Sequence, residues 1–96
     1  MRGAPMDNRT GEMQVFLRVV ETGSFSEAAR VLGMTPSTVS KLISRIEARL
    51  GVRLVERSTR QLSLTTEGQI YYDRSRALLN DLDLIEQELS HGAAAT

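Results

Sequence analysis

A run of short hydroxyl side chains around one lysine is the stretch of this sequence with the most specific chemistry. It spans residues 35–50, TPSTVSKLISRIEARL, and Gly51 follows it. On a helical wheel of about 100° per residue, one arc contains no carboxylate. The side chains on this arc and at its margin are Ser37, Ser40, Lys41, Ser44, Arg45 and Arg49. A surface of this kind can lie close to phosphate groups and to the edges of bases.

The same stretch carries the signals of a helix. Thr35 is a candidate N-cap, and Pro36 suits the first helical position, where its missing N–H costs nothing. Gly51 suits the left-handed residue that closes a helix. The arc opposite the hydroxyls is apolar, and we expect its side chains to be buried: Val39, Leu42, Ile43, Ile46 and Leu50.

Two shorter helices are predicted ahead of this one. In residues 12–22 the apolar positions that share one helical face are Met13, Phe16, Leu17 and Val20. Ser24 then opens a capping box with Glu27, and Gly33 ends the short helix that follows. Two helices joined by so short a turn match a helix-turn-helix, in which the second helix enters the major groove.

After Gly51 the pattern becomes that of strands, because leucines alternate with polar residues over residues 61–64. Residues 58–60 supply the expected turn, so the segment is predicted to be a two-stranded hairpin, or wing, beside the helix-turn-helix. Arg57 and Arg60 would lie near its tip. They are either solubilising turn residues or, as we favour beside a basic helix, contacts to the minor groove or backbone.

A long last helix is expected to begin after Thr65, a further N-cap candidate, and to run to about residue 90. Its stripe follows the heptad spacing of a helix pair: Tyr71, Ser75, Leu78, Leu82, Ile85 and Leu89. At about 1.5 Å per residue this helix would reach roughly 37 Å, more than so small a domain can cover. Its distal half is therefore predicted to pair with a second copy.

The composition of the chain limits which classes of protein it can belong to. The chain has 96 residues, enough for one small domain, and its formal net charge is zero. That average hides a segregation, because residues 30–60 carry a net charge of +5 and residues 61–96 a net charge of −4. Without cysteine and with His91 as the single histidine, neither a disulfide nor a metal site is expected, and no cofactor is predicted. No apolar run suits a membrane span or a signal peptide, so we expect a soluble, cytoplasmic protein.

Taken together, GSFSEAARVLGMTPSTVSKLISRIEARLGVRLVERSTRQLSLTTEG resembles the amino-terminal DNA-binding domain of LysR-type transcriptional regulators of bacteria. The resemblance covers about residues 12–90 in one unbroken order. It implies a mainly α fold, a winged helix-turn-helix of three helices plus a two-stranded hairpin, followed by a long linker helix through which two subunits pair. Each subunit would then read half of a roughly palindromic operator.

By position, the resemblance implies base contacts from Pro36, Ser37, Thr38 and Lys41, a phosphate contact from Ser40, and a wing contact from Arg60. The complete set predicted to bind DNA is Thr35, Pro36, Ser37, Thr38, Ser40, Lys41, Ser44, Arg45, Arg57 and Arg60. Lys41 is the candidate for guanine O6 or N7. Arg45 and Arg49 are expected to position the protein on phosphates at most, or else to pair with Glu47 or Glu56.

Two departures from the family pattern are visible. Val55 stands where many relatives have phenylalanine, which is expected to loosen the wing without moving Arg60. The effector-binding domain of two α/β lobes has no counterpart here, so the chain is expected to be the DNA-binding part alone. A small-molecule effector would act only through that absent domain.

The sequence therefore predicts a homodimeric domain that binds a palindromic operator and regulates transcription, paired through Tyr71, Leu78, Leu82, Ile85 and Leu89. No nucleophile with a base and no glycine-rich phosphate loop is present, so an enzyme is not expected. The alternative is a winged-helix module that binds protein, with the acidic last helix as its docking surface. The expected organisation is a disordered leader over 1–10, the winged helix-turn-helix over 11–65, the linker helix over 66–90 and a disordered tail over 91–96.

Overall fold

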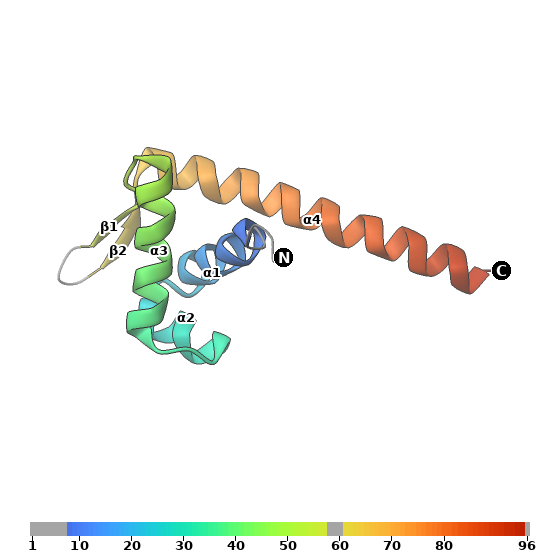
Figure 1. Cartoon of the computed structure of the whole chain (residues 1–96), viewed down its shortest axis with the longest axis horizontal. Coiled ribbons are helices and arrows are strands. Elements are labelled where there is room, and N and C mark those ends of the chain that lie inside the picture. Colours follow the sequence, from blue (N-terminus) through green and yellow to red (C-terminus); the bar gives the residue numbers. More distant parts are fainter. Residues whose placement is uncertain (1–7, 58–60, 96) are drawn as a thin grey trace, which may run out of the picture.

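The computed structural model describes residues 8–57 and 61–95. It consists of four helices and one antiparallel hairpin, which confirms the predicted fold class (Figure 1). The elements are α1 Arg9–Thr22, α2 Phe25–Leu32, α3 Pro36–Leu50, β1 Val55–Arg57, β2 Leu62–Leu64 and α4 Thr66–Ala95. The first three helices form a small bundle, the hairpin lies beside α3, and α4 extends away from the bundle as a single rod.

The predicted helix ends are those observed for α2 and α3. The hydroxyl of Ser24 accepts from the N–H of Glu27 at 3.1 Å, and that of Thr35 accepts from the N–H of Thr38 at 3.2 Å. Gly51 closes α3 with a φ of 74°, a left-handed conformation that a side chain would strain. In a full capping box the Glu27 carboxylate would also accept from the N–H of Ser24. Here that carboxylate accepts from Arg30 at 2.7 Å instead.

The core lies where α1, α2, α3 and the start of the hairpin meet. Its buried apolar side chains are Val15, Phe16, Val19, Ala28, Ala29, Val39, Ile43, Ile46, Leu54 and Val55. Val55 is fully buried, so the smaller side chain still fills the junction between wing and bundle. The predicted core residue Leu50 is 47% exposed, because α3 ends at the edge of the bundle, where Val52 is also exposed.

The buried face of α1 differs from the predicted one. Val15, Phe16 and Val19 are buried, whereas Met13, Leu17 and Val20 are only partly so. The reason is that α1 packs against α2 and α3 on one side and against α4 on another. The stripe at Met13 and Leu17 is thus one margin of the buried surface and not its centre.

Both terminal boundaries also differ. Helix α1 begins at Arg9, inside the predicted leader, because the carbonyl of Asn8 accepts from the N–H of Glu12 at 3.0 Å and an acidic residue suits the first turn. Helix α4 continues to Ala95, where a disordered tail was predicted. Three consecutive alanines, the best helix formers, follow the glycine there.

The wing pairs Val55 with Leu64 and Arg57 with Leu62 in antiparallel register. The predicted turn over residues 58–60, and Arg60 with it, lies outside the described residues. Behind the wing, Tyr71 of α4 packs edge-on against Phe16, with ring centroids 5.1 Å apart, so the base of α4 belongs to the core.

Farther along α4, every side chain from residue 81 to residue 90 is exposed. This half of the helix projects past the bundle (Figure 1). Within residues 8–57 and 61–95, no helix combines the length and apolar character needed to cross a bilayer.

Candidate nucleic-acid interface

The outward face of α3 carries the predicted hydroxyl-and-lysine surface. Its exposed side chains are Pro36, Ser37, Thr38, Lys41, Ser44 and Arg45, and Ser40 is partly buried beside them. At the amino end the hydroxyl of Thr35 also donates to that of Thr38 at 2.8 Å, which orders the first turn. Free N–H groups at a helix start and short hydroxyls along it suit contact with phosphate oxygens.

The cations of this region differ in how far carboxylates neutralise them. Arg49 lies 2.6 Å from Glu12, whose side chain is only 8% exposed, and Arg45 lies 3.9 Å from the same carboxylate. Arg30 is paired with Glu27. Both carboxylate partners, Glu12 and Glu27, lie outside residues 30–60. The net charge of +5 counted for that segment therefore overstates the charge that is free to bind an anion.

Lys41 is an exposed cation of α3 that stays available to bind an anion. Among the described residues it makes no ion pair, and it lies at the middle of the hydroxyl face. Arg45 is 67% exposed and only distantly paired, so it also keeps a solvent-facing guanidinium. These two charges are the ones that α3 offers to a polyanion.

Glu47 ties the wing to α3. One oxygen of its carboxylate accepts from the N–H of Leu54 at 2.8 Å and from the N–H of Val55 at 3.2 Å. The chain entering β1 is therefore held by two charge-assisted hydrogen bonds, which are stronger than neutral ones. Arg53 lies 3.8 Å from the same oxygen. The position of the wing is thus set by a residue of α3.

Arg57, the last residue of β1 before the predicted turn, joins the wing to α3 a second time, because its side chain reaches back to the helix. Its guanidinium donates to the hydroxyl of Ser40 at 3.1 Å and to that of Ser44 at 3.3 Å. The group lies over the ring of Phe25, 5.0 Å from the centroid, and 3.9 Å from Glu47. Arg57 therefore lies on the side of α3, facing the helix.

The structure thus brings the α3 residues and Arg57 together, while Arg60 lies outside the described residues. Sequence reasoning missed Glu12, Phe25 and Glu47. A signal for Glu12 was present, because residues 12, 15, 16 and 19 follow the spacing of one helical face. A carboxylate on an otherwise apolar face needs a cation, and Arg49 supplies it.

The heptad stripe predicted along α4 has two parts with different surroundings. Tyr71 and Ser75 face the chain's own core. Past the bundle the same stripe continues into solvent, with Leu78, Leu82, Ile85 and Leu89 all exposed. An apolar stripe on an otherwise charged helix is costly to leave in water, so this part of α4 is suited to burial against another helix.

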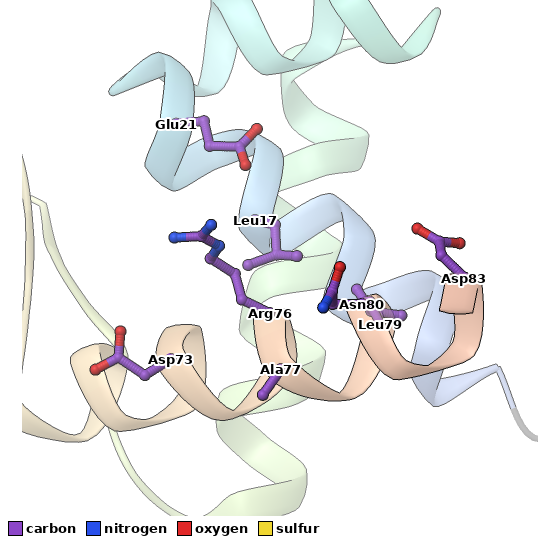
Figure 2. A pocket seen from close by; sticks show the side chains of 8 residues that line it. All are labelled: Leu17, Glu21, Asp73, Arg76, Ala77, Leu79, Asn80 and Asp83. Atoms are coloured by element: carbon purple, nitrogen blue, oxygen red, sulfur yellow. The ribbon is translucent and has the colours of Figure 1, made fainter. Parts of the chain in front are cut away.

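A shallow pocket lies between α1 and α4 (Figure 2). Its lining residues are Leu17, Glu21, Asp73, Arg76, Ala77, Leu79, Asn80 and Asp83. The carboxylates stand at its rim and point in different directions. Over residues 8–57 and 61–95 no cluster of acidic residues or histidine is arranged to hold a metal ion.

Comparison with known proteins gives consistent results. Residues 10–69 match the family of bacterial regulatory helix-turn-helix proteins named after LysR. The chain is 46% identical over 84 residues to the HTH-type transcriptional regulator CrgA of Neisseria meningitidis, covering 88% of this chain and 28% of CrgA. The chain thus spans less than a third of the length of such relatives.

Solved structures of DNA complexes are also similar. The DNA-binding domain of BenM with catB site 1 DNA has a TM-score of 0.83 and 31% identity, over 92% of this chain and 96% of that one. The DNA-binding domain of CbnR with DNA has a TM-score of 0.77 and 30% identity, over 93% and 99% of the two chains.

Proposed function

The chain belongs to the LysR family of bacterial transcriptional regulators and corresponds to their DNA-binding domain, and we propose that it binds a palindromic operator as a homodimer. The observation that carries the proposal is the outward face of α3, where Lys41, which no described carboxylate engages, lies among the hydroxyls of Ser37, Ser40 and Ser44. The expectation that this sequence resembles the family is confirmed.

In the proposed complex α3 lies in the major groove, with its amino end toward the base edges. Direct readout would come from Pro36, Ser37, Thr38 and Lys41, with Lys41 donating to guanine O6 or N7. Thr35, Ser40, Ser44 and Arg45 would hold phosphates or bases at the groove edge. The carboxylate-free character of this face supports the proposal, since a carboxylate would repel the phosphate backbone.

The dimer is proposed to form along the distal part of α4. Leu78, Leu82, Ile85 and Leu89 keep heptad spacing and are exposed there. We leave Tyr71 out of the pairing surface, because its ring already packs against Phe16. Burial of this stripe would supply the surface that a domain of this size otherwise lacks.

The relatives named above are regulators and not enzymes, and no reaction is proposed here. Because the chain covers only 28% of CrgA, the response to a small-molecule effector is proposed for the longer protein alone. A protein that binds chromosomal operators would act in the bacterial cytoplasm.

The proposal is tested by selecting duplexes from a randomised library and by titrating salt on the selected duplex. We expect an enriched palindrome whose half-sites lie about one helical turn apart, roughly 34 Å, or a multiple of it. Displacement of counterions should give a steep negative dependence of affinity on salt.

Weak, salt-sensitive binding to every duplex would contradict sequence-specific readout by α3. Absence of any DNA binding would instead favour the protein-interaction module. The matched charge control is Arg18→Ala, because Arg18 lies on α1 and pairs with Glu21 at 2.7 Å, away from the α3 face. This variant should select the same duplex with the same affinity.

A further inference from the structure

Arg57 lies where it can set the direction in which two hydroxyls of α3 donate. Its two terminal nitrogens reach Ser40 at 3.1 Å and Ser44 at 3.3 Å, one nitrogen to each hydroxyl. The guanidinium is held over the Phe25 ring and near Glu47, and the side chain is only 33% exposed. Four contacts from two helices, α2 and α3, therefore fix it in place.

We propose that Arg57 is a positioning residue that turns the hydroxyls of Ser40 and Ser44 into hydrogen-bond donors for DNA, an inference that rests on the proposed function. A guanidinium can only donate, whereas a serine hydroxyl has one proton and two acceptor lone pairs. When Arg57 occupies a lone pair on each oxygen, each proton must point elsewhere.

Nothing within the described part of the chain takes up those protons. Helical serines often donate to the carbonyl of the preceding turn, as Thr22 does to Arg18 at 2.8 Å. Neither Ser40 nor Ser44 makes such a bond among the described residues. Both protons are thus available on the side of α3 that faces solvent.

A donor directed outward discriminates between the atoms of a duplex. Phosphate oxygens, guanine O6 and N7, adenine N7 and thymine O4 accept hydrogen bonds, whereas the exocyclic amines of cytosine and adenine donate them. With one lone pair taken by Arg57 and the proton directed outward, Ser40 and Ser44 each favour an acceptor opposite the proton, while one lone pair per oxygen stays open to an amine. Arg57 itself, paired with protein groups, adds no phosphate contact of its own.

The test is a cycle of variants measured on the duplex that the unmodified chain selects. Arg57→Gln is compared with the double variant Ser40→Ala and Ser44→Ala, and with the combination of all three changes. We expect Arg57→Gln to weaken binding about five- to tenfold, the value of one or two hydrogen bonds. In the background that lacks both hydroxyls the same change should have no further effect.

The salt dependence separates positioning from direct contact. If Arg57 bound a phosphate, Arg57→Gln would reduce the salt slope by about one. We expect the slope to be unchanged. Arg57→Lys adds a second measure, because lysine is a good phosphate binder but cannot span two hydroxyls as the planar fork does. We expect it to be impaired like Arg57→Gln.

A smaller salt slope for Arg57→Gln, full affinity for Arg57→Lys, or an equal loss with and without the hydroxyls would each overturn this inference alone. Circular dichroism and urea unfolding of each variant report whether the wing still folds, and Arg57→Lys keeps the positive charge of this side chain. If the unmodified chain selects no duplex, the proposed function fails, and this inference fails with it.

Discussion

The guanidinium of Arg49 lies 2.6 Å from the carboxylate of Glu12 and joins the end of α3 to the start of α1. The two residues are 37 positions apart, and the Glu12 side chain is only 8% exposed. A buried carboxylate without a partner loses its hydration and gains no compensating interaction. Since Arg49 provides that interaction only where the two helices meet as they do here, the contact fixes the angle between α1 and α3.

Arg49→Met should therefore destabilise the domain by about 1 to 3 kcal/mol, since it leaves Glu12 buried with only the distant Arg45 nearby. Urea unfolding followed by circular dichroism measures this change. The matched control is Arg18→Met, which removes an equally close pair with Glu21 on the exposed surface. That change should cost no more than about 1 kcal/mol. Equal effects of the two substitutions would show that the buried pair has no special role.

Lys41→Ala should weaken binding to the selected duplex by about 1 to 3 kcal/mol and relax the preference at one base pair. The physical reason is the loss of a donor at guanine O6 or N7, on a side chain that no described carboxylate engages. Binding to a set of single-base variants of the duplex measures both effects. Uniform weakening across that set would assign Lys41 to a phosphate instead of a base.

The local signals in the sequence predicted the parts of the fold that depend on near neighbours. Thr35, Pro36 and Gly51 marked both ends of α3, and the alternation near Leu62 marked the second strand of the hairpin. Such signals act within a few residues, so they can be found without knowing which surfaces meet.

Ion pairs and hydrogen bonds between residues far apart in the chain could not be predicted from the sequence. The carboxylates considered for Arg49, besides a phosphate contact, are Glu47 and Glu56, which lie close in the chain, whereas its partner Glu12 is brought to it only by packing. The approach of Arg57 to Ser40 likewise could not be predicted, since it depends on how the wing lies on α3.

Leu82→Glu should dissociate the proposed dimer, because it places a charge in the heptad stripe of α4. Sedimentation measures the oligomeric state. Leu84→Glu is the matched control, since Leu84 is similarly exposed but lies about 200° around the helix from Leu82. The control should dimerise normally. A dimer unaffected by Leu82→Glu would place the pairing surface elsewhere.

Gly68→Ala should destabilise the domain even though alanine favours helices. A methyl group at this position would overlap the carbonyl oxygen of Leu54, the same oxygen that accepts from the N–H of Thr65 at 3.0 Å. Moving that carbonyl loosens the junction between β1 and α4, so we expect a cost of about 1 to 3 kcal/mol. The exposed neighbour Gln69 provides the control, and Gln69→Ala should change the free energy of unfolding by less than about 0.5 kcal/mol. A stabilised Gly68→Ala variant would mean that the junction yields at little cost.

The last prediction concerns alkaline pH. Burial raises the pKa of the Tyr71 hydroxyl above its ordinary value of 10.0, and the charge of Arg49 offsets this only in part. Below pH 10 the phenol is neutral in both the folded and the unfolded chain, so its contribution to stability is then complete. As the pH rises further, the unfolded chain ionises first, and this contribution is lost as the pH passes through the folded pKa.

Urea unfolding at a series of alkaline pH values should therefore show a steeper loss of stability in the unmodified chain than in Tyr71→Phe, which has no phenol to ionise at this position. Tyr72→Phe is the matched control and should keep the steep loss, because it retains Tyr71. The two variants should be compared by the difference between their curves, since every titratable group other than these two tyrosines is the same in both. Parallel curves for Tyr71→Phe and the unmodified chain would show that the phenol ionises equally easily in the folded domain, and hence that the base of α4 is less tightly docked on α1 than its contact with Phe16 indicates.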